Sequence, residues 1–307
     1  MSRQPEKPEQ RPGSRHHALR RAAGRAARVA VALLVLIAIA AMSGCCERLF
    51  YHPTDAVYST PDQYNLSHEP VTFTSADGTA LSGWFLPAVG RAKGTVVHCH
   101  GNAQNMTSHW QFAEFLPRRG FNLFVFDYRG YGRSEGSPDR QGTVEDARAA
   151  VDYVLGRDDV DPGRVGLFGQ SLGGAVATVV AAGDQRVRGL VLDSTFTSYR
   201  DEAAHALRAN PVTWLCAWPL SRLLIRSGLD PMDYIARIAP RPALLVHGTG
   251  DRVVPHEMSR ELAEQAGEPK ELWLVDGARH TAPIYRAGET YRRKVCALFE
   301  KAFAAPP

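Results

Sequence analysis

Eight short apolar runs alternate with longer segments of helical periodicity between residues 71 and 303. Several runs, such as 124–126 and 244–246, contain no polar residue, which is typical of strands that helices cover on both faces. This alternation predicts an open α/β sheet. The predicted strands are 71–74, 81–86, 95–100, 121–128, 164–170, 189–193, 243–247 and 271–275, and the predicted helices are 143–155, 173–182, 257–266 and 290–303.

One segment, 196–236, interrupts this alternation between the sixth and seventh predicted strands. It either forms a short helical insertion that caps the carboxyl edge of the sheet and builds an apolar substrate pocket, or it is a crossover helix lengthened by packing residues. Its large apolar side chains are Trp214, Trp218, Leu220, Leu223, Leu224, Ile225 and Met232.

Ser171 lies in a G-x-S-x-G pentapeptide, Gly169–Gly173, between a predicted strand and a predicted helix. A serine on such a sharp turn has a strained backbone that exposes its Oγ. The following helix N-terminus places partial positive charge beside a developing oxyanion. The context therefore predicts that Ser171 is a nucleophile.

A serine hydroxyl is a weak nucleophile and needs a base, which an acid must orient. His280 follows the last predicted strand in a loop and is the predicted base, with His256 as its nearest rival. Asp251 follows the seventh predicted strand and is the predicted acid. Asp193, after the sixth strand, is the competitor, and Asp276 lies too close to the histidine loop to be favoured.

Two backbone N–H groups should stabilise the oxyanion. Leu172 follows the nucleophile, and Asn102 lies in the loop after the third predicted strand, so these residues are the predicted donors. The nearby run His98-Cys99-His100 does not predict a metal site. Alternate strand residues point to opposite faces, so Cys99 cannot join the two histidines.

The N-terminal 45 residues resemble an export signal. Residues 1–28 are rich in arginine, residues 29–42 are apolar, and small residues follow. Residues 42–45 also resemble a lipobox, which makes Cys45 a lipidation candidate. The alternatives are an uncleaved membrane anchor and a cleaved signal peptide. Each places the body outside the cytoplasm, attached to a membrane in the first two cases.

Charge is distributed unevenly along the chain. Residues 1–45 carry eight basic and two acidic side chains, so the formal charge of +4 leaves −2 for residues 46–307. Such a body does not attract phosphate backbones, and no nucleic-acid partner is expected. Residues 46–69, rich in turn formers, are predicted to be a linker, and residues 70–304 are predicted to be the folded domain.

In combination, five motifs resemble the α/β-hydrolase superfamily, in particular its serine-aminopeptidase-like branch, which also contains membrane-anchored lipid hydrolases and depalmitoylases. The resemblance covers about residues 70–304. It implies an eight-stranded, mostly parallel sheet, no cofactor, and triad roles for Ser171, Asp251 and His280. The motifs are HGNAQN (100–105), DYRGYGRSEG (127–136), DPGRVGLFGQSLGG (161–174), HGTGDRVVP (247–255) and DGARH (276–280).

These observations predict a membrane-attached serine hydrolase that cleaves small-molecule carboxylic esters, thioesters or lipids through an acyl-enzyme on Ser171. A related alternative is amide or peptide hydrolysis, although the sequence shows no recognisable group for a substrate α-amine. An alternative of a different class is a non-catalytic binding protein that retains the hydrolase fold.

Overall fold

The computed structural model describes residues 50–304 and the isolated positions 22, 24, 25, 28, 29 and 32. Most of the predicted export segment, including Cys45, lies outside the described residues. Among the residues that are described, no helix has the length and apolar character needed to cross a membrane.

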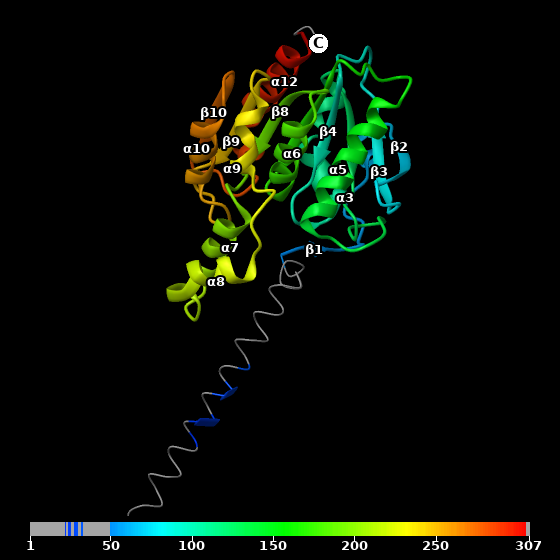
Figure 1. Ribbon diagram of the computed structural model, residues 1–307. Helices are drawn as coiled ribbons and strands as arrows, with labels where there is room; N and C mark the ends of the chain where they lie inside the picture. Colours follow the sequence, from blue (N-terminus) through cyan, green and yellow to red (C-terminus); the bar gives the residue numbers. More distant parts are fainter. Residues whose placement is uncertain (1–21, 23, 26–27, 30–31, 33–49, 305–307) are drawn as a thin grey trace, which may run out of the picture.

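Eight strands form one sheet in the order β10-β9-β8-β7-β4-β6-β3-β2 (Figure 1). β3 is antiparallel to both of its neighbours, and all the other neighbouring pairs are parallel. This sheet confirms the predicted fold class, and each predicted strand overlaps one of its members. The strands are β2 (Glu69–Thr74), β3 (Ala80–Leu86), β4 (Thr95–Cys99), β6 (Asn122–Phe126), β7 (Val165–Gln170), β8 (Val187–Asp193), β9 (Ala243–Gly248) and β10 (Lys270–Val275).

Helices cover both faces of the sheet and bury two hydrophobic cores. Successive residues of β6 alternate between the cores, with Phe124 in one and Val125 in the other. The first core packs against α5, α6 and α10, and the second packs against α4 and α12. The helices of the body are α3 (Met106–His109), η2 (Trp110–Phe112), α4 (Phe115–Arg118), α5 (Arg140–Leu155), α6 (Leu172–Gly183), α10 (His256–Gln265), α11 (Pro283–Ala287) and α12 (Glu289–Ala304).

A helical insertion follows β8, the sixth predicted strand. α7 (Tyr199–Arg208), η3 (Trp214–Cys216) and α8 (Ala217–Leu224) pack on one another and protrude at the carboxyl edge of the sheet (Figure 1). We call residues 199–224 the cap. The remainder of the predicted 196–236 insertion behaves differently, because α9 (Pro231–Tyr234) and η4 (Ile235–Ile238) pack against α6 of the body.

The described part of the predicted linker is packed on the body. β1 (His52–Pro53) pairs in parallel with β5 (Ala103–Gln104), and η1 (Pro61–Tyr64) follows. Tyr51 and Leu66 are buried. Residues 50–69 are therefore part of the folded unit, although their turn-rich composition predicts a linker.

Candidate active site

Ser171 occupies the turn between β7 and α6 with φ 51° and ψ −117°. A non-glycine residue rarely adopts a positive φ, so the surrounding structure must hold this conformation. Its N–H donates to the Asp193 carbonyl oxygen at 2.9 Å, and its own carbonyl accepts from Gly174 N–H at 3.0 Å. The strained turn predicted from the pentapeptide is thus present.

The glycines around Ser171 permit close approach of backbone segments. A Cβ on Gly169 would lie 2.4 Å from the Gly173 carbonyl oxygen, and a Cβ on Gly173 would lie 2.0 Å from the Cys99 carbonyl oxygen. A side chain on Gly169 would push β7 away from α6, and a side chain on Gly173 would push α6 away from β4. The G-x-S-x-G pattern therefore reflects a steric requirement of the turn.

The structure brings the three predicted triad residues together. His280 Nε2 lies 3.0 Å from Ser171 Oγ, and His280 Nδ1 lies 2.7 Å from Asp251 Oδ2. Nδ1–H donates to the carboxylate, so Nε2 is free to accept the serine hydroxyl proton. Asp251 is buried and follows β9, whereas His280 is only partly buried and lies in the loop after β10.

Asp251 is held by more than the imidazole of His280. Its Oδ1 accepts the N–H groups of Val253 at 2.9 Å and Val254 at 3.0 Å, and its Oδ2 lies 3.1 Å from His247 Nε2. Burial by itself would raise the pKa of Asp251. The hydrogen bonds from His247 and His280 outweigh that effect and lower the pKa below its ordinary value. Asp251 is therefore a carboxylate at neutral pH.

The two rival acids have other partners. Asp193 accepts the Tyr291 hydroxyl at 2.6 Å and the Ser194 hydroxyl at 2.8 Å, deep in the body. Asp276 accepts the Thr249 hydroxyl at 3.2 Å in an exposed position. The carboxylate that contacts His280 belongs to Asp251.

The two predicted oxyanion donors line the same pocket as Ser171. The backbone N–H groups of Leu172 and Asn102 donate to no other group among the described residues, so both are available to a ligand. The Asn102 side chain donates to the Phe50 carbonyl oxygen. The Tyr131 hydroxyl donates to the Asn102 carbonyl oxygen at 2.7 Å, which fixes this loop from a second side.

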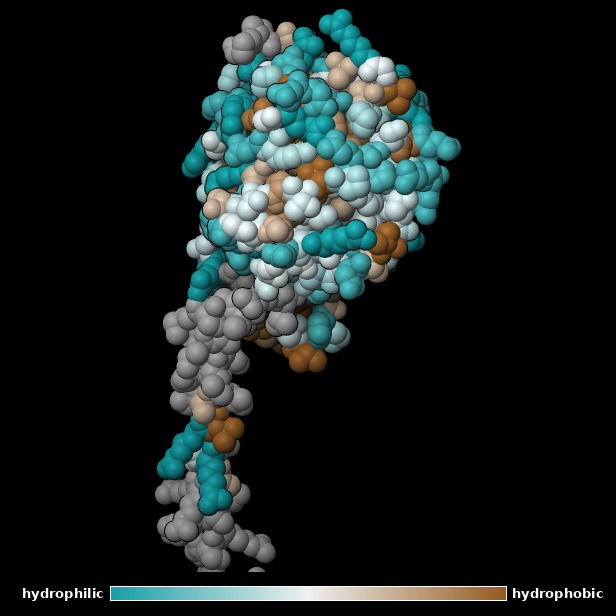
Figure 2. All heavy atoms as spheres, turned by 90° about the vertical axis from the view of Figure 1, so that its right-hand side faces the viewer, coloured by the Kyte–Doolittle hydropathy of each residue, from teal (hydrophilic) through white to brown (hydrophobic). Residues whose placement is uncertain are grey.

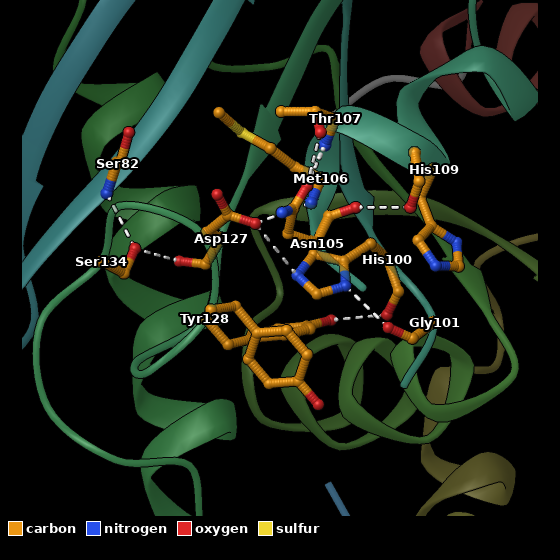
Figure 3. Close-up of polar contacts among 12 residues, drawn as sticks. Ser82, His100, Gly101, Asn105, Met106, Thr107, His109, Asp127, Tyr128 and Ser134 are labelled. Carbon is orange, nitrogen blue, oxygen red and sulfur yellow. Dashed lines mark hydrogen bonds and ion pairs between the residues drawn. The ribbon is translucent and has the colours of Figure 1, made fainter. Parts of the chain in front are cut away.

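Buried polar contacts hold the loop that carries Asn102 (Figure 3). His100 Nδ1–H donates to the Gly101 carbonyl oxygen at 2.7 Å, and Asp127 Oδ1 accepts from Met106 N–H at 2.6 Å. Burial, with a smaller effect of His109, holds the pKa of His100 well below its usual range, so the ring is neutral. His100 therefore has a structural role: its buried, neutral ring helps to hold the loop that carries Asn102.

A cavity of about 670 Å³ opens beside Ser171 and His280. The cap forms one wall, and the segment 50–52 forms another through Phe50 and His52. Most of the lining is apolar, which suits an acyl chain or another apolar group. Its apolar members include Phe50, Leu172, Phe196, Ala203, Ala206, Leu207, Leu224, Ile225 and Val253.

Glu202 of α7 is the one carboxyl residue in the described lining of this cavity. The residue is 8% exposed, and its Oε2 has no hydrogen-bond partner among the described residues. Burial, together with the nearby charge of Asp251, raises the pKa of Glu202 to about 8. The group is therefore mostly neutral at pH 7. The sequence shows only a charged residue in a helical segment, and it gives no sign of this burial.

The His98-Cys99-His100 run separates as the strand alternation predicts. His98 Nε2 lies 3.2 Å from Gln170 Oε1. Cys99 is buried in the first core, on the other face of the sheet. In the part of the chain that the structure describes, no three or more His, Cys, Asp or Glu side chains form a group that could hold a metal ion. Cys216 and Cys296 are separate free thiols, the first exposed and the second buried.

The sheet order, the strand–turn–helix at Ser171 and the chain order serine, aspartate, histidine define an α/β hydrolase. Comparisons with known proteins agree. Residues 94–219 match the family described as the alpha/beta hydrolase fold. The protein YfhR of Escherichia coli K12 is 42% identical over 253 residues, which cover 80% of this chain and 84% of YfhR.

Two further similarities extend to a plant and an archaeon. The alpha/beta hydrolase domain-containing protein WAV2 of Arabidopsis thaliana is 31% identical over 87% of this chain and 92% of its own. An esterase of Pyrococcus furiosus superposes with a TM-score of 0.70 at 25% identity, covering 82% of this chain and 98% of that structure. The chain belongs to the α/β-hydrolase superfamily.

Proposed function

We propose that the protein is a serine hydrolase that cleaves carboxylic esters or thioesters through an acyl-enzyme on Ser171. The observation that carries the proposal is the continuous contact from Ser171 Oγ to His280 Nε2, 3.0 Å, and from His280 Nδ1 to Asp251 Oδ2, 2.7 Å, at the wall of an apolar cavity. The esterase of Pyrococcus furiosus, which shares the fold, supports ester chemistry.

The proposed reaction has two balanced halves. Ser171 Oγ attacks the acyl carbonyl carbon while His280 Nε2 takes the hydroxyl proton, and the backbone N–H groups of Leu172 and Asn102 stabilise the oxyanion. Collapse breaks the bond to the leaving oxygen or sulfur, which receives the proton from His280. Water then attacks the acyl-enzyme in the same manner, which releases the acid and restores the Ser171 hydroxyl.

The apolar cavity supports an acyl substrate of intermediate or greater chain length. A series of p-nitrophenyl esters from acetyl to dodecanoyl tests this directly. We expect kcat/KM to rise with chain length until the cavity is filled. A preference for acetyl over every longer ester would contradict the acyl-pocket assignment.

Covalent labelling by a fluorophosphonate probe tests the nucleophile. We expect rapid labelling of the wild-type protein and none of Ser171→Ala. Ser67→Ala provides a matched control, because Ser67 is exposed and lies outside the cavity, so the substitution should leave labelling unchanged. Absence of labelling in folded wild-type protein would support the non-catalytic binding protein instead.

We also propose that residues 1–45 export the body and attach it to a membrane, either through a lipidated Cys45 or as an uncleaved anchor. The proposal rests on the arginine-rich segment followed by the apolar run 29–42. Mass spectrometry of the protein from a membrane fraction distinguishes the two attachments. A diacylated N-terminal peptide beginning at Cys45 supports the lipoprotein, and an intact 1–44 segment rejects it.

A further inference from the structure

The outer surface of the cap carries a cluster of exposed apolar side chains. Eleven large hydrophobic residues are exposed among those that the structure describes, and five of them fall within residues 212–223. Scattered exposed apolar side chains are ordinary, but a contiguous group marks a surface that contacts something else. We call this group the cap patch: Val212, Trp214, Leu215, Trp218 and Leu223, which are 45–87% exposed.

The cap patch is distinct from the cavity lining. On α8, Ser221 and Leu224 face the cavity, whereas Trp218 and Leu223 are exposed. A helix that is apolar on both sides is normally buried on both sides. Figure 2 shows hydrophobic side chains protruding at the end of the body where the cap lies, whereas much of the face above is hydrophilic.

The cap has a small excess of positive charge. Residues 199–224 contain three arginines, Arg200, Arg208 and Arg222, and two acids, Asp201 and Glu202, so their formal charge is +1, although residues 46–307 together carry −2. The Arg222 guanidinium lies 3.8 Å from the centroid of the Trp218 ring and 3.6 Å from the Asp201 carboxylate. Tryptophan and arginine side by side suit the interface between water and an anionic bilayer.

The chain enters the described body at the same end. The ring of Phe50 lies 5.5 Å from that of Tyr199, the first residue of α7, and Phe50 also lines the cavity. β1 and the cap lie together, far from the C-terminal end of α12 (Figure 1). An attachment that precedes residue 50 by a few residues would therefore hold the cap and the cavity near the membrane surface.

We propose that the cap patch inserts into the surface of an anionic lipid bilayer and so brings the cavity beside Ser171 to membrane-borne acyl substrates. This inference deepens the proposed function and rests on its membrane attachment. Insertion buries the five apolar side chains of the cap patch, while the arginines contact anionic headgroups.

Cys216 provides a probe inside the cap patch, since it is exposed and the described thiols Cys99 and Cys296 are buried. The full chain is labelled with an NBD maleimide and reconstituted into vesicles of phosphatidylcholine alone or with phosphatidylglycerol. We expect a blue shift and quenching by spin-labelled lipid, both stronger with phosphatidylglycerol. Cys216→Ser, labelled in parallel, measures the signal from all other thiols.

The variant Val212→Ser/Leu215→Ser should lose the blue shift and the lipid quenching. The matched control is Val89→Ser. Val89 is also exposed, but it follows β3 at the edge of the sheet opposite the cap. NBD emission that keeps the wavelength of a water-exposed probe in both kinds of vesicle would overturn the proposal. So would a blue shift that depends on protein concentration without lipid, because a second copy of the chain would then cover the cap patch.

Fluorophosphonate labelling of the same samples separates this proposal from the proposed function. If Ser171 is labelled and NBD at Cys216 shows no blue shift, the hydrolase proposal stands and the proposed insertion of the cap patch into lipid is rejected. The reverse result supports lipid contact by a protein without the proposed chemistry. Hydrolysis of soluble p-nitrophenyl acetate should be unchanged in Val212→Ser/Leu215→Ser, since neither side chain lines the cavity.

Discussion

His247 contacts Asp251 through Nε2, 3.1 Å from Oδ2, which is the same oxygen that lies 2.7 Å from His280 Nδ1. His247 is itself fixed, because its Nδ1 lies 2.6 Å from Ser259 Oγ on α10. One carboxylate oxygen is thus shared between a buried histidine and the histidine that contacts Ser171. This arrangement makes His247 a positioning residue for Asp251.

Replacing His247 by leucine should therefore lower kcat more than it changes KM. A hydrogen bond to a charged group contributes about 1.5–3 kcal/mol, so we expect kcat to fall by about tenfold to a hundredfold. His247→Gln, which can still donate an N–H, should recover part of the loss. Steady-state kinetics on a p-nitrophenyl ester, with thermal melting as a check on folding, measure both. A folded His247→Leu variant with unchanged kcat would show that Asp251 needs no such support.

The choice between Asp251 and Asp193 is tested by the same substitution at each. Asp251→Asn should lower kcat by about 10⁴, because the amide favours the wrong imidazole tautomer. Asp193→Asn should retain much more activity, since the Asp193 carboxylate is hydrogen-bonded to Tyr291 and Ser194 rather than to His280. It should instead lower the melting temperature through those buried contacts. Equal losses of kcat in both folded variants would contradict the assignment of Asp251.

Patterns that are local in sequence predicted most of the architecture. The strands of the sheet are short apolar-rich runs, several of them continuously apolar, and the predicted bounds of each of the eight lie within a few residues of the observed ones. The strand–turn–helix around Ser171 also has a local sequence signature, because only glycine leaves room for the close backbone contacts on either side of the serine. The carboxyl ends of parallel strands meet at one edge of a sheet, and for this reason the sequence alone pairs Asp251 and His280 with Ser171.

Features that depend on distant contacts could not be predicted in this way. The sequence shows Glu202 only as a charged residue of a helical segment, because its burial depends on the position of α7 beside the cavity. The sequence shows His247 only as a strand residue, because its contacts with Asp251 and Ser259 depend on how the loop after β9 and α10 pack beside it. Residues 50–69 have no periodic pattern, and β1 spans only two residues, so their packing on β5 leaves no trace in the sequence.

Glu202 should give the activity an alkaline limit. Its pKa is raised to about 8, so the side chain is neutral below this pH and becomes a carboxylate above it. A charge in an apolar cavity disfavours an apolar ligand. We therefore expect KM for an uncharged octanoyl ester to rise by about tenfold as the pH passes from 7 to 9.5, in line with the cost of burying a charge without a partner. Initial rates across this pH range test the prediction.

The control for this experiment is Glu202→Gln, which keeps the shape but cannot ionise. Its KM should stay constant across the same pH range. Glu264→Gln, at an exposed position on α10, should behave like the wild-type protein. If the alkaline rise in KM persists in Glu202→Gln, another group causes it and the assignment fails.

The Arg129 side chain, which is buried, should contribute strongly to the stability of the folded protein. The Arg129 guanidinium forms ion pairs outside its own loop, residues 127–136, at 2.8 Å from Asp146 of α5 and 2.8 Å from Asp77. Asp146 is fully buried, so Arg129→Met leaves a buried carboxyl without its cation, at a cost of about 3–5 kcal/mol.

The matched control for Arg129→Met is Arg186→Met. Arg186 also pairs with two aspartates, Asp152 and Asp184, but its side chain is 54% exposed. Exposed pairs contribute about 0–1 kcal/mol, because water and salt screen them. Urea unfolding of both variants should therefore show a large loss of unfolding free energy for Arg129→Met and a small one for Arg186→Met. Similar losses in the two variants would contradict the prediction, because the burial of Asp146 would then add nothing to the energy of its ion pair with Arg129.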